Sequence, residues 1–280
     1  MKLLFEGSGI AYKAMYVIGF VIMMIVNLKI YKKFELTKRT TVIFTLITYF
    51  AGVYGAMKMG DIYNVITEKF NVDGSTVAIF GAVVFTPLIM TAVALVTGKP
   101  WRRIMDLLAP GIFIILACAK FGCFMGGCCP GRECRFGVYN PEYEMTMFPS
   151  QLFESITMAF VVGFCFWFIF RCKKNISGSV YPVTAAVYSV TRFFWEFMRY
   201  YKYEEMRHLI LGMTFWQFWC ITVIVLSIVW ILLLRSEKIA SLEGKTYAFI
   251  DNCYKTVTDK WEKFKHRNDK NIVHHKKKKK

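Results

Sequence analysis

The sequence predicts an all-α integral membrane protein with about seven transmembrane helices. Of its 280 residues, 56% are hydrophobic, whereas soluble domains have about 45–50%. A helix that spans a membrane needs about 20 mostly apolar residues. Seven segments meet that requirement, namely residues 11–31, 40–59, 77–97, 104–121, 152–170, 180–200 and 210–234.

Basic residues are concentrated in alternate connections between these segments. They lie in residues 28–40, 98–103 and 171–175 and in the tail after residue 235. Lys and Arg close to a span favour the cytoplasmic side of the membrane, so we expect all four regions to lie inside. Seven spans then place the N-terminus outside and the C-terminus inside. The opposite side receives the connections 60–76, 122–150 and 201–209.

The chain divides into a membrane domain, residues 1–235, and a basic cytoplasmic tail, residues 236–280. The tail holds 13 Lys or Arg and 6 Asp or Glu. Its apolar residues recur at steps of four and three, which predicts an amphipathic helix: Ile250, Tyr254, Val257, Trp261 and Phe264. We expect this helix to lie on anionic lipid of the inner leaflet; a solvated, partly disordered tail is the alternative. The net charge of +17 could suit nucleic acid, but the apolar spans favour a membrane, so no nucleic-acid partner is expected.

Charged residues inside the spans indicate a functional site, because such residues are costly in a bilayer. Arg192, Glu196 and Arg199 follow one another at i, i+4 and i+7, which puts them on one face of a helix. Arginine pairs well with phosphate or carboxylate. The spacing predicts a site for an anionic headgroup near the outer end of span 180–200, with a satisfied ion-pair ladder as the alternative. Asp106 is explained by a local salt bridge or as an acid at a helix N-terminus. Lys120 either reaches the membrane surface or lies at a ligand that the adjacent Gly122 lets approach the backbone.

The connection 122–150 is rich in glycine and proline and is expected to be non-helical, lining a cavity or buried in protein. It contains four cysteines in the pattern C-x4-C-C-x4-C, at positions 123, 128, 129 and 134. This pattern lacks the C-x2-C pair typical of zinc sites, and no histidine lies within it. Neither a metal nor a cofactor is expected, while disulfides and packed free thiols both stay open.

Six short motifs follow one another in order along the chain. They occupy residues 11–14, Asp106 with Pro110, residues 120–124 running on to Gly131, and residues 147–154, 192–199 and 212–217. The stretch F-P-S-Q-L-F-E within 147–154 resembles the H-P-S-Q-L-Y-E motif of the bacterial prolipoprotein diacylglyceryl transferases. Residues 192–199 are similar to that family's R-F-x-x-E-F-x-R, and residues 120–131 look like a variant of its G-R-x-G-N-F…G.

The resemblance implies an enzyme of the bacterial cytoplasmic (inner) membrane that transfers diacylglyceryl from phosphatidylglycerol to the lipobox cysteine thiol of a prolipoprotein. It implies catalytic roles for Arg192, Glu196 and Lys120. In these roles Arg192 and Arg199 clamp the phosphate, Lys120 assists and Glu196 orients the arginines. Tyr12, Glu196 or His208 is a candidate for the proton transfer that a family histidine would perform. It also implies substrate-binding roles for a further set, Arg199, Gly122, Gly131, Ser150, Gln151, Glu154 and Asp106.

The chain departs from the family pattern mainly where the family handles protons. Phe80 and Phe148 stand where the family has histidines, and Lys120 and Cys123 replace its arginine and asparagine. The residues that the resemblance assigns to phosphate binding therefore match the family pattern better than those it assigns to proton transfer. This leaves two alternatives within the fold, a non-catalytic phospholipid-binding protein and a transferase with a different acceptor. A small-anion transporter is disfavoured because no inverted repeat is visible, and a metal-dependent redox protein is less favoured still.

Overall fold

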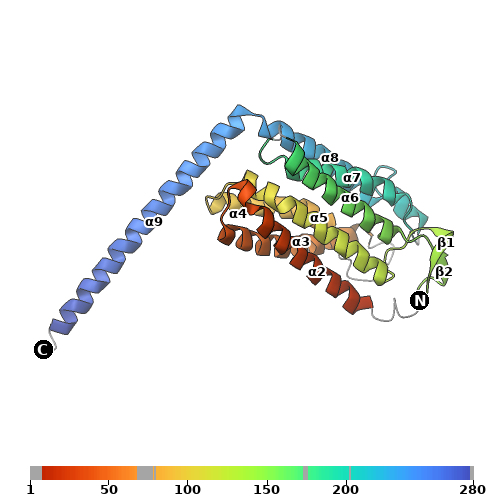
Figure 1. The fold of residues 1–280 in the computed structure, drawn as a ribbon, viewed down its shortest axis with the longest axis horizontal. Coiled ribbons are helices and arrows are strands. Elements are labelled where there is room, and N and C mark those ends of the chain that lie inside the picture. Colours follow the sequence, from red (N-terminus) through yellow and green to blue (C-terminus); the bar gives the residue numbers. More distant parts are fainter. Residues whose placement is uncertain (1–7, 68–77, 79, 173–175, 202, 278–280) are drawn as a thin grey trace.

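The body of the protein is a bundle of helices (Figure 1). The computed structural model describes residues 8–67, 78, 80–172, 176–201 and 203–277. Within them the bundle consists of α2 (Ser8–Ile30), α3 (Lys38–Thr67), α4 (Phe80–Val96), α5 (Trp101–Met125), α6 (Ser150–Arg171), α7 (Val180–Glu196) and α8 (Phe215–Leu234). The short 3-10 helices η1 (Tyr31–Phe34) and η3 (Glu204–His208) lie in connections. A long helix, α9 (Glu237–Lys277), leaves the bundle at one end, and an antiparallel hairpin, β1 (Glu133–Asn140) with β2 (Met145–Met147), covers the other.

The structure supports a multi-pass membrane protein. Five of its helical segments are long and apolar enough to cross a membrane: Tyr12–Phe34, Lys38–Thr67, Trp101–Met125, Ser150–Arg171 and Phe215–Leu234. The helices α4 and α7 have 17 residues each, which is shorter than a typical span. Each of the seven predicted apolar segments coincides with one helix. The count of seven crossings and the orientation of the termini stay predictions.

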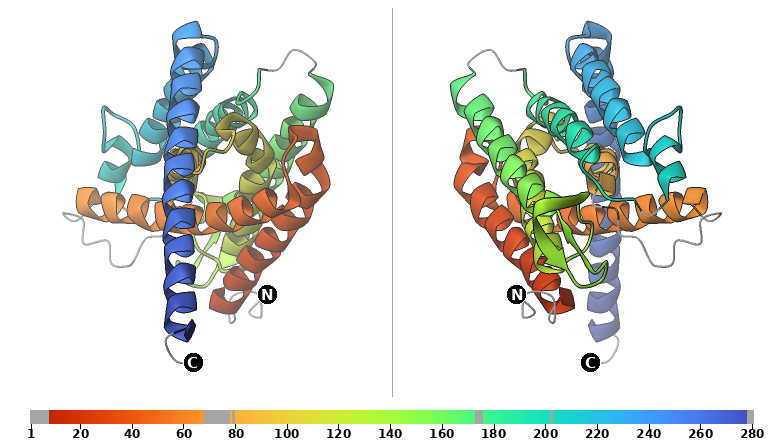
Figure 2. Two further views of the ribbon diagram at one scale, coloured as in Figure 1. Left: turned by 90° about the vertical axis from the view of Figure 1, so that its left-hand side faces the viewer. Right: turned by 90° about the vertical axis from the view of Figure 1, so that its right-hand side faces the viewer.

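Helix α5 is the centre of the bundle. In its apolar window 67% of the residues are buried, against 17–39% in the other four candidate spans. It packs against α2, α4, α6 and α7, and Figure 2 shows it near the middle of the bundle in both end views. The other spans expose large apolar side chains on their outer faces, such as Phe160 at 74%, as expected of helices whose outer faces meet lipid.

Glycine allows α3 and α4 to pack backbone against backbone. A Cβ placed on Gly81 would lie 2.1 Å from the carbonyl oxygen of Gly55, well inside any real contact distance. Small residues at such crossings let membrane helices approach closely, which maximises their van der Waals contact. This crossing therefore tolerates no side chain at Gly81.

Three predicted boundaries were wrong. Helix α5 continues to Met125, beyond residue 121, so Lys120 lies inside the helix and Gly122 is helical. Helix α8 begins at Phe215 rather than at residue 210, because Thr214 and Gln217 form a capping box there. Helix α7 ends at Glu196, so Arg199 is not on the helix that carries Arg192.

The loop before the hairpin explains why α7 ends early. Residues 130–132 form hydrogen bonds with backbone groups of residues 198–200, which would otherwise form the hydrogen bonds of a longer helix. The Arg132 N–H donates to the Met198 carbonyl at 2.9 Å, and the Tyr200 N–H donates to the Pro130 carbonyl at 3.1 Å. Gly131 and Arg199 thereby form an isolated β-bridge. These contacts involve residues some 70 positions apart, so helical periodicity alone could not predict them.

Candidate functional site

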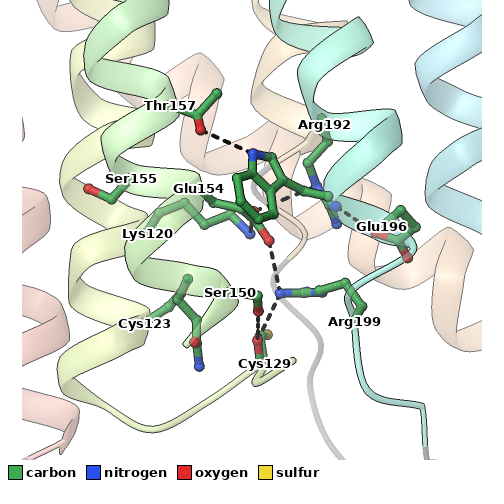
Figure 3. A network of polar contacts seen from close by, with 12 residues as sticks. Lys120, Cys123, Cys129, Ser150, Glu154, Ser155, Thr157, Arg192, Glu196 and Arg199 are labelled. Carbon is green, nitrogen blue, oxygen red and sulfur yellow. Dashed lines mark hydrogen bonds and ion pairs between the residues drawn. The ribbon is translucent and has the colours of Figure 1, made fainter. Parts of the chain in front are cut away.

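Five charged side chains converge at the hairpin end of the bundle (Figure 3). Lys120 comes from α5, Glu154 from α6, Arg192 and Glu196 from α7, and Arg199 from the segment after α7. All except Arg199 are less than a tenth exposed as residues, and the Arg199 side chain is 11% exposed. We call these five residues the charge cluster.

Glu154 is the centre of the charge cluster. Its Oε2 pairs with the Lys120 ammonium and, at 3.7 Å, with the Nε of Arg192. Its Oε1 lies 3.4 Å from Nη1 of Arg199. One carboxylate therefore holds three cations that would otherwise repel one another.

Glu196 supplies the second negative charge. Its Oε2 lies 2.6 Å from Nη1 of Arg192, one helical turn away. Its other oxygen accepts a hydrogen bond from the Tyr201 hydroxyl. Burial, followed by the charge of Glu196, raises the pKa of Tyr201 well above 10, so this phenol stays protonated and acts as a donor.

The charge cluster carries a surplus of one positive charge, since three cations face two carboxylates. A buried charge without a partner is expensive. A ligand with one negative charge, such as a phosphodiester or a carboxylate, would balance the surplus. Arginine and lysine are the groups that proteins most often use for such anions.

The N-terminus of α6 holds the neighbouring loop in place. The Ser150 hydroxyl donates to the Cys129 carbonyl at 3.3 Å, and the Gln151 amide donates to the Cys128 carbonyl at 2.6 Å. Arg199 also donates to the Cys129 carbonyl, at 2.9 Å. Cys129 adopts a positive φ of 59°, and its carbonyl oxygen accepts hydrogen bonds from both Ser150 and Arg199. In this structure Ser150 and Gln151 thus bind the loop next to the charge cluster.

The two predicted glycines make close contacts with protein. A Cβ on Gly131 would lie 2.8 Å from the carbonyl oxygens of Met198 and Phe148, which explains why the β-bridge to Arg199 needs glycine. A Cβ on Gly122 would lie 3.2 Å from Met15 on α2. Gly122 therefore lies in the contact between α2 and α5.

The structure does not bring Asp106 to the charge cluster. Asp106 and Lys120 are 14 residues apart in α5, which corresponds to about 21 Å along the helix axis. The Asp106 carboxylate accepts hydrogen bonds from the backbone N–H groups of Gly178, at 2.6 Å, and Val180, at 2.9 Å. It thereby caps the N-terminus of α7, where a negative charge is favoured.

Tyr12 lies on α2 and lines a cavity of about 330 Å³ between α2, α3, α4 and α5. Its hydroxyl donates to the hydroxyl of Tyr16 at 3.1 Å. The walls of this cavity are mostly apolar, and Thr48, Tyr49 and Thr86 add further hydroxyls. Tyr12 thus lies at this cavity, and its hydrogen bond is to Tyr16 and not to a residue of the charge cluster.

Phe80 and Phe148, which the resemblance aligns with histidines, are packed among other rings. Phe80 lies against Tyr188, with ring centroids 5.6 Å apart. Phe148 stacks on Phe153 at 5.0 Å and on Trp195 at 6.3 Å. Of the four histidines in the sequence, His208 bonds to the Gly212 carbonyl and the other three lie in the tail. The charge cluster therefore has no imidazole.

The cysteines of the connection 122–150 are free thiols in the structure. Cys128 donates a weak hydrogen bond to the Cys123 carbonyl at 3.7 Å. Contact with the Cys123 thiol, together with burial, raises the pKa of Cys128 to about 12. Among the described residues, no group of three His, Cys, Asp or Glu side chains is arranged to hold a metal ion.

Sequence reasoning missed Tyr201 altogether, and it gave Glu154 a substrate-binding role without indicating that Glu154 is the centre of the charge cluster. No local signal marks Tyr201, because it follows the end of α7 and meets Glu196 through a turn. The signal for Glu154 was present as a lone carboxylate in an apolar span, which is costly unless it is paired.

Comparison with known proteins identifies relatives. The profile of a family described as prolipoprotein diacylglyceryl transferase matches residues 8–233. The chain is 28% identical over 173 residues to phosphatidylglycerol–prolipoprotein diacylglyceryl transferase 2 of Clostridium perfringens; this covers 55% of the chain and 65% of the relative. It is 26% identical over 111 residues to the phosphatidylglycerol–prolipoprotein diacylglyceryl transferase of Clostridium tetani, covering 36% and 43% respectively. Each match thus spans less than two thirds of the relative.

Proposed function

The chain belongs to the prolipoprotein diacylglyceryl transferase family, and we propose that it transfers diacylglyceryl from phosphatidylglycerol to the lipobox cysteine of a prolipoprotein. We place this activity in a bacterial cytoplasmic membrane, with the charge cluster on the outer side. The observation that carries the proposal is the surplus of one positive charge among the five buried residues around Glu154. The phosphodiester of phosphatidylglycerol carries one negative charge and would balance it.

The reaction is a substitution at the glycerol carbon that bears the phosphate. The acceptor sulfur forms a C–S bond to this carbon, and the C–O bond to the phosphate breaks with its electron pair staying on oxygen. The thiol proton is released, and glycerol phosphate departs with a second negative charge. Fixed cations directed at this oxygen lower the barrier, because the charge develops there in the transition state.

Each member of the charge cluster has a distinct part in this proposal. Arg192 and Arg199 clamp the phosphate with their planar donors, and Lys120 adds a third positive charge. Glu154 keeps these three cations at a fixed spacing. Glu196 orients Arg192 through the contact of 2.6 Å.

One observation favours a second candidate, a phospholipid-binding protein without this chemistry. Phe80 and Phe148 place aromatic rings where the resemblance aligns histidines, so neither of these two positions can take the thiol proton. The phosphate site would then hold a lipid without transferring its diacylglyceryl group. A transferase with a different acceptor is the other alternative.

The test is a direct assay of the transfer. The purified protein in detergent is incubated with phosphatidylglycerol and a lipobox-cysteine peptide, and mass spectrometry looks for the diacylglyceryl thioether. Arg192→Ala removes the clamp, and Arg135→Ala, an exposed arginine in β1, is the matched control. The proposal expects product with the wild-type chain and Arg135→Ala, and none with Arg192→Ala. Retained lipid without product in the wild-type chain would favour the second candidate.

A further inference from the structure

Helix α9 crosses the end of the bundle that lies opposite the charge cluster. It begins at Glu237, two residues after α8 ends at Leu234 and its C-cap Arg235. Figure 1 shows it leaving α8 at a sharp angle, and Figure 2 shows it running across the end of the bundle and beyond it. Since α8 is a candidate span, α9 starts where that span leaves the membrane.

A set of polar contacts fixes the first turns of α9 to the start of α5. The Glu243 carboxylate accepts hydrogen bonds from the Trp101 indole at 2.7 Å and from Nε of Arg102 at 3.0 Å. The Tyr247 hydroxyl donates to the Lys99 carbonyl at 2.9 Å and accepts from the Trp101 N–H at 3.2 Å. The direction of α9 relative to the bundle is therefore set by specific bonds.

A neighbouring face of α9 is apolar and uncovered. Leu242 is 59% exposed and Phe249 is 69% exposed, and Cys253 is exposed as well. Steps of seven and four residues put these three within about 40° of one another around the helix, since each residue turns it by about 100°. Exposed apolar side chains gathered on one face of a helix mark a surface for lipid or for a partner.

The charges at this end of the molecule favour an anionic lipid surface as the occupant. Residues 237–258 contain three Lys or Arg and three Asp or Glu, whereas residues 259–280 contain ten and three. The nearby connection at residues 28–40 adds five basic residues and only one acidic residue, Glu35. Anionic lipid attracts each basic residue near a membrane surface by about 1 kcal/mol.

We propose that α9 is a membrane-surface helix that lies on the leaflet at this end of the bundle. Its first half is held by the Glu243 and Tyr247 contacts and by insertion of Leu242 and Phe249 into the boundary between headgroups and acyl chains. Its second half is held by anionic lipid. The helix thus fixes the depth and the rotation of the bundle in the bilayer.

The test uses the full chain in nanodiscs of phosphatidylcholine with and without phosphatidylserine, a lipid unrelated to the proposed donor. An environment-sensitive fluorophore is attached to Cys253 in a Cys129→Ser background, which removes the other exposed thiol. The matched control carries the fluorophore at Ala248→Cys in a Cys129→Ser, Cys253→Ser chain. Residue 248 lies about 140° from residue 253 around the helix, and Ala248 is exposed.

The proposal expects the fluorophore at residue 253 to be quenched by nitroxide-labelled lipid and shielded from aqueous iodide, with phosphatidylserine strengthening both effects. The fluorophore at residue 248 is expected to show the reverse. Equal iodide quenching at both positions in both lipids would overturn the proposal, because α9 would then be solvated. A second result would also overturn the proposal: residue 253 stays shielded from iodide in detergent, and the particle has twice the mass of one chain. A second copy of the chain would then cover this face. Neither result depends on transferase activity.

Discussion

Removing the negative charge of Glu154 should destabilise the protein strongly. Glu154→Gln keeps the size of the side chain but leaves Arg192, Arg199 and Lys120 facing only Glu196, so the surplus charge rises from one to two. At a separation near 3.5 Å each lost ion pair is worth about 5 kcal/mol at an effective dielectric constant of ~20. Desolvation already opposes these pairs, so the expected net loss of stability is about 3–5 kcal/mol, as for other buried pairs that lose one partner.

The assay is thermal unfolding of the purified protein in detergent. Glu154→Gln should lower the apparent melting temperature by an amount on the order of 10 °C. Glu142→Gln is the matched control, because Glu142 is exposed in the hairpin turn, and it should leave the melting temperature unchanged. An unchanged melting temperature in Glu154→Gln would refute the conclusion that Glu154 stabilises the three buried cations.

A double variant separates charge from packing. Lys120→Met combined with Glu154→Gln returns the surplus to one positive charge, so it should recover a large part of the stability lost in Glu154→Gln. Contacting residues of this kind have coupling energies of about 0.5–3 kcal/mol. Additive losses in the double variant would mean that the contact between Lys120 and Glu154 contributes little.

Three further predictions follow from other parts of the structure. Gly81→Ala should disrupt the crossing of α3 and α4 and lower the melting temperature, whereas Gly163→Ala, where a Cβ meets nothing within 4 Å, should be neutral or slightly stabilising because alanine favours helix by about 1 kcal/mol. Asp106→Ala should cost about 2–3 kcal/mol of stability by removing the carboxyl cap of α7, while phosphatidylglycerol binding by the folded fraction stays unchanged; a selective loss of lipid binding would support the substrate-binding role of Asp106. Cys128, with its pKa raised to about 12, stays a thiol up to high pH, so peptide mass spectrometry at pH 8 should find it alkylated far more slowly by iodoacetamide than the exposed Cys253, and equal rates would contradict the raised pKa.

The apolar runs predicted where the helices lie because the length of an apolar segment is a local property. The prediction failed where distant residues decide a boundary. Arg199 was expected on the same helix as Arg192, but hydrogen bonds from residues 130–132 end α7 at Glu196. Arg199 still reaches the charge cluster, through Glu154 instead of Glu196.

The chemistry of the site was predictable only in part. Charged residues in spans identified Arg192, Glu196 and Lys120, because their cost in lipid requires a reason. The pairing of Lys120 and Glu154 joins α5 to α6, and no spacing within one helix could indicate it. Asp106 was selected for a substrate-binding role by a motif; its carboxylate caps α7, and the binding role stays a prediction.

If the seven predicted spans cross the membrane, the pairs Lys120–Glu154 and Arg192–Glu196 each enter the bilayer with opposite charges already matched. A lone charge at the centre of a helix costs about 2.5–3.5 kcal/mol during insertion. Lys120 and Glu154 lie on consecutive helices that pack together, so Glu154 on α6 neutralises the buried charge of Lys120 on α5. Helix α7 brings the pair of Arg192 and Glu196. The remaining positive charge of the cluster is that of Arg199, which lies beyond the end of α7. The charge that attracts the anion therefore comes from a residue outside the helices.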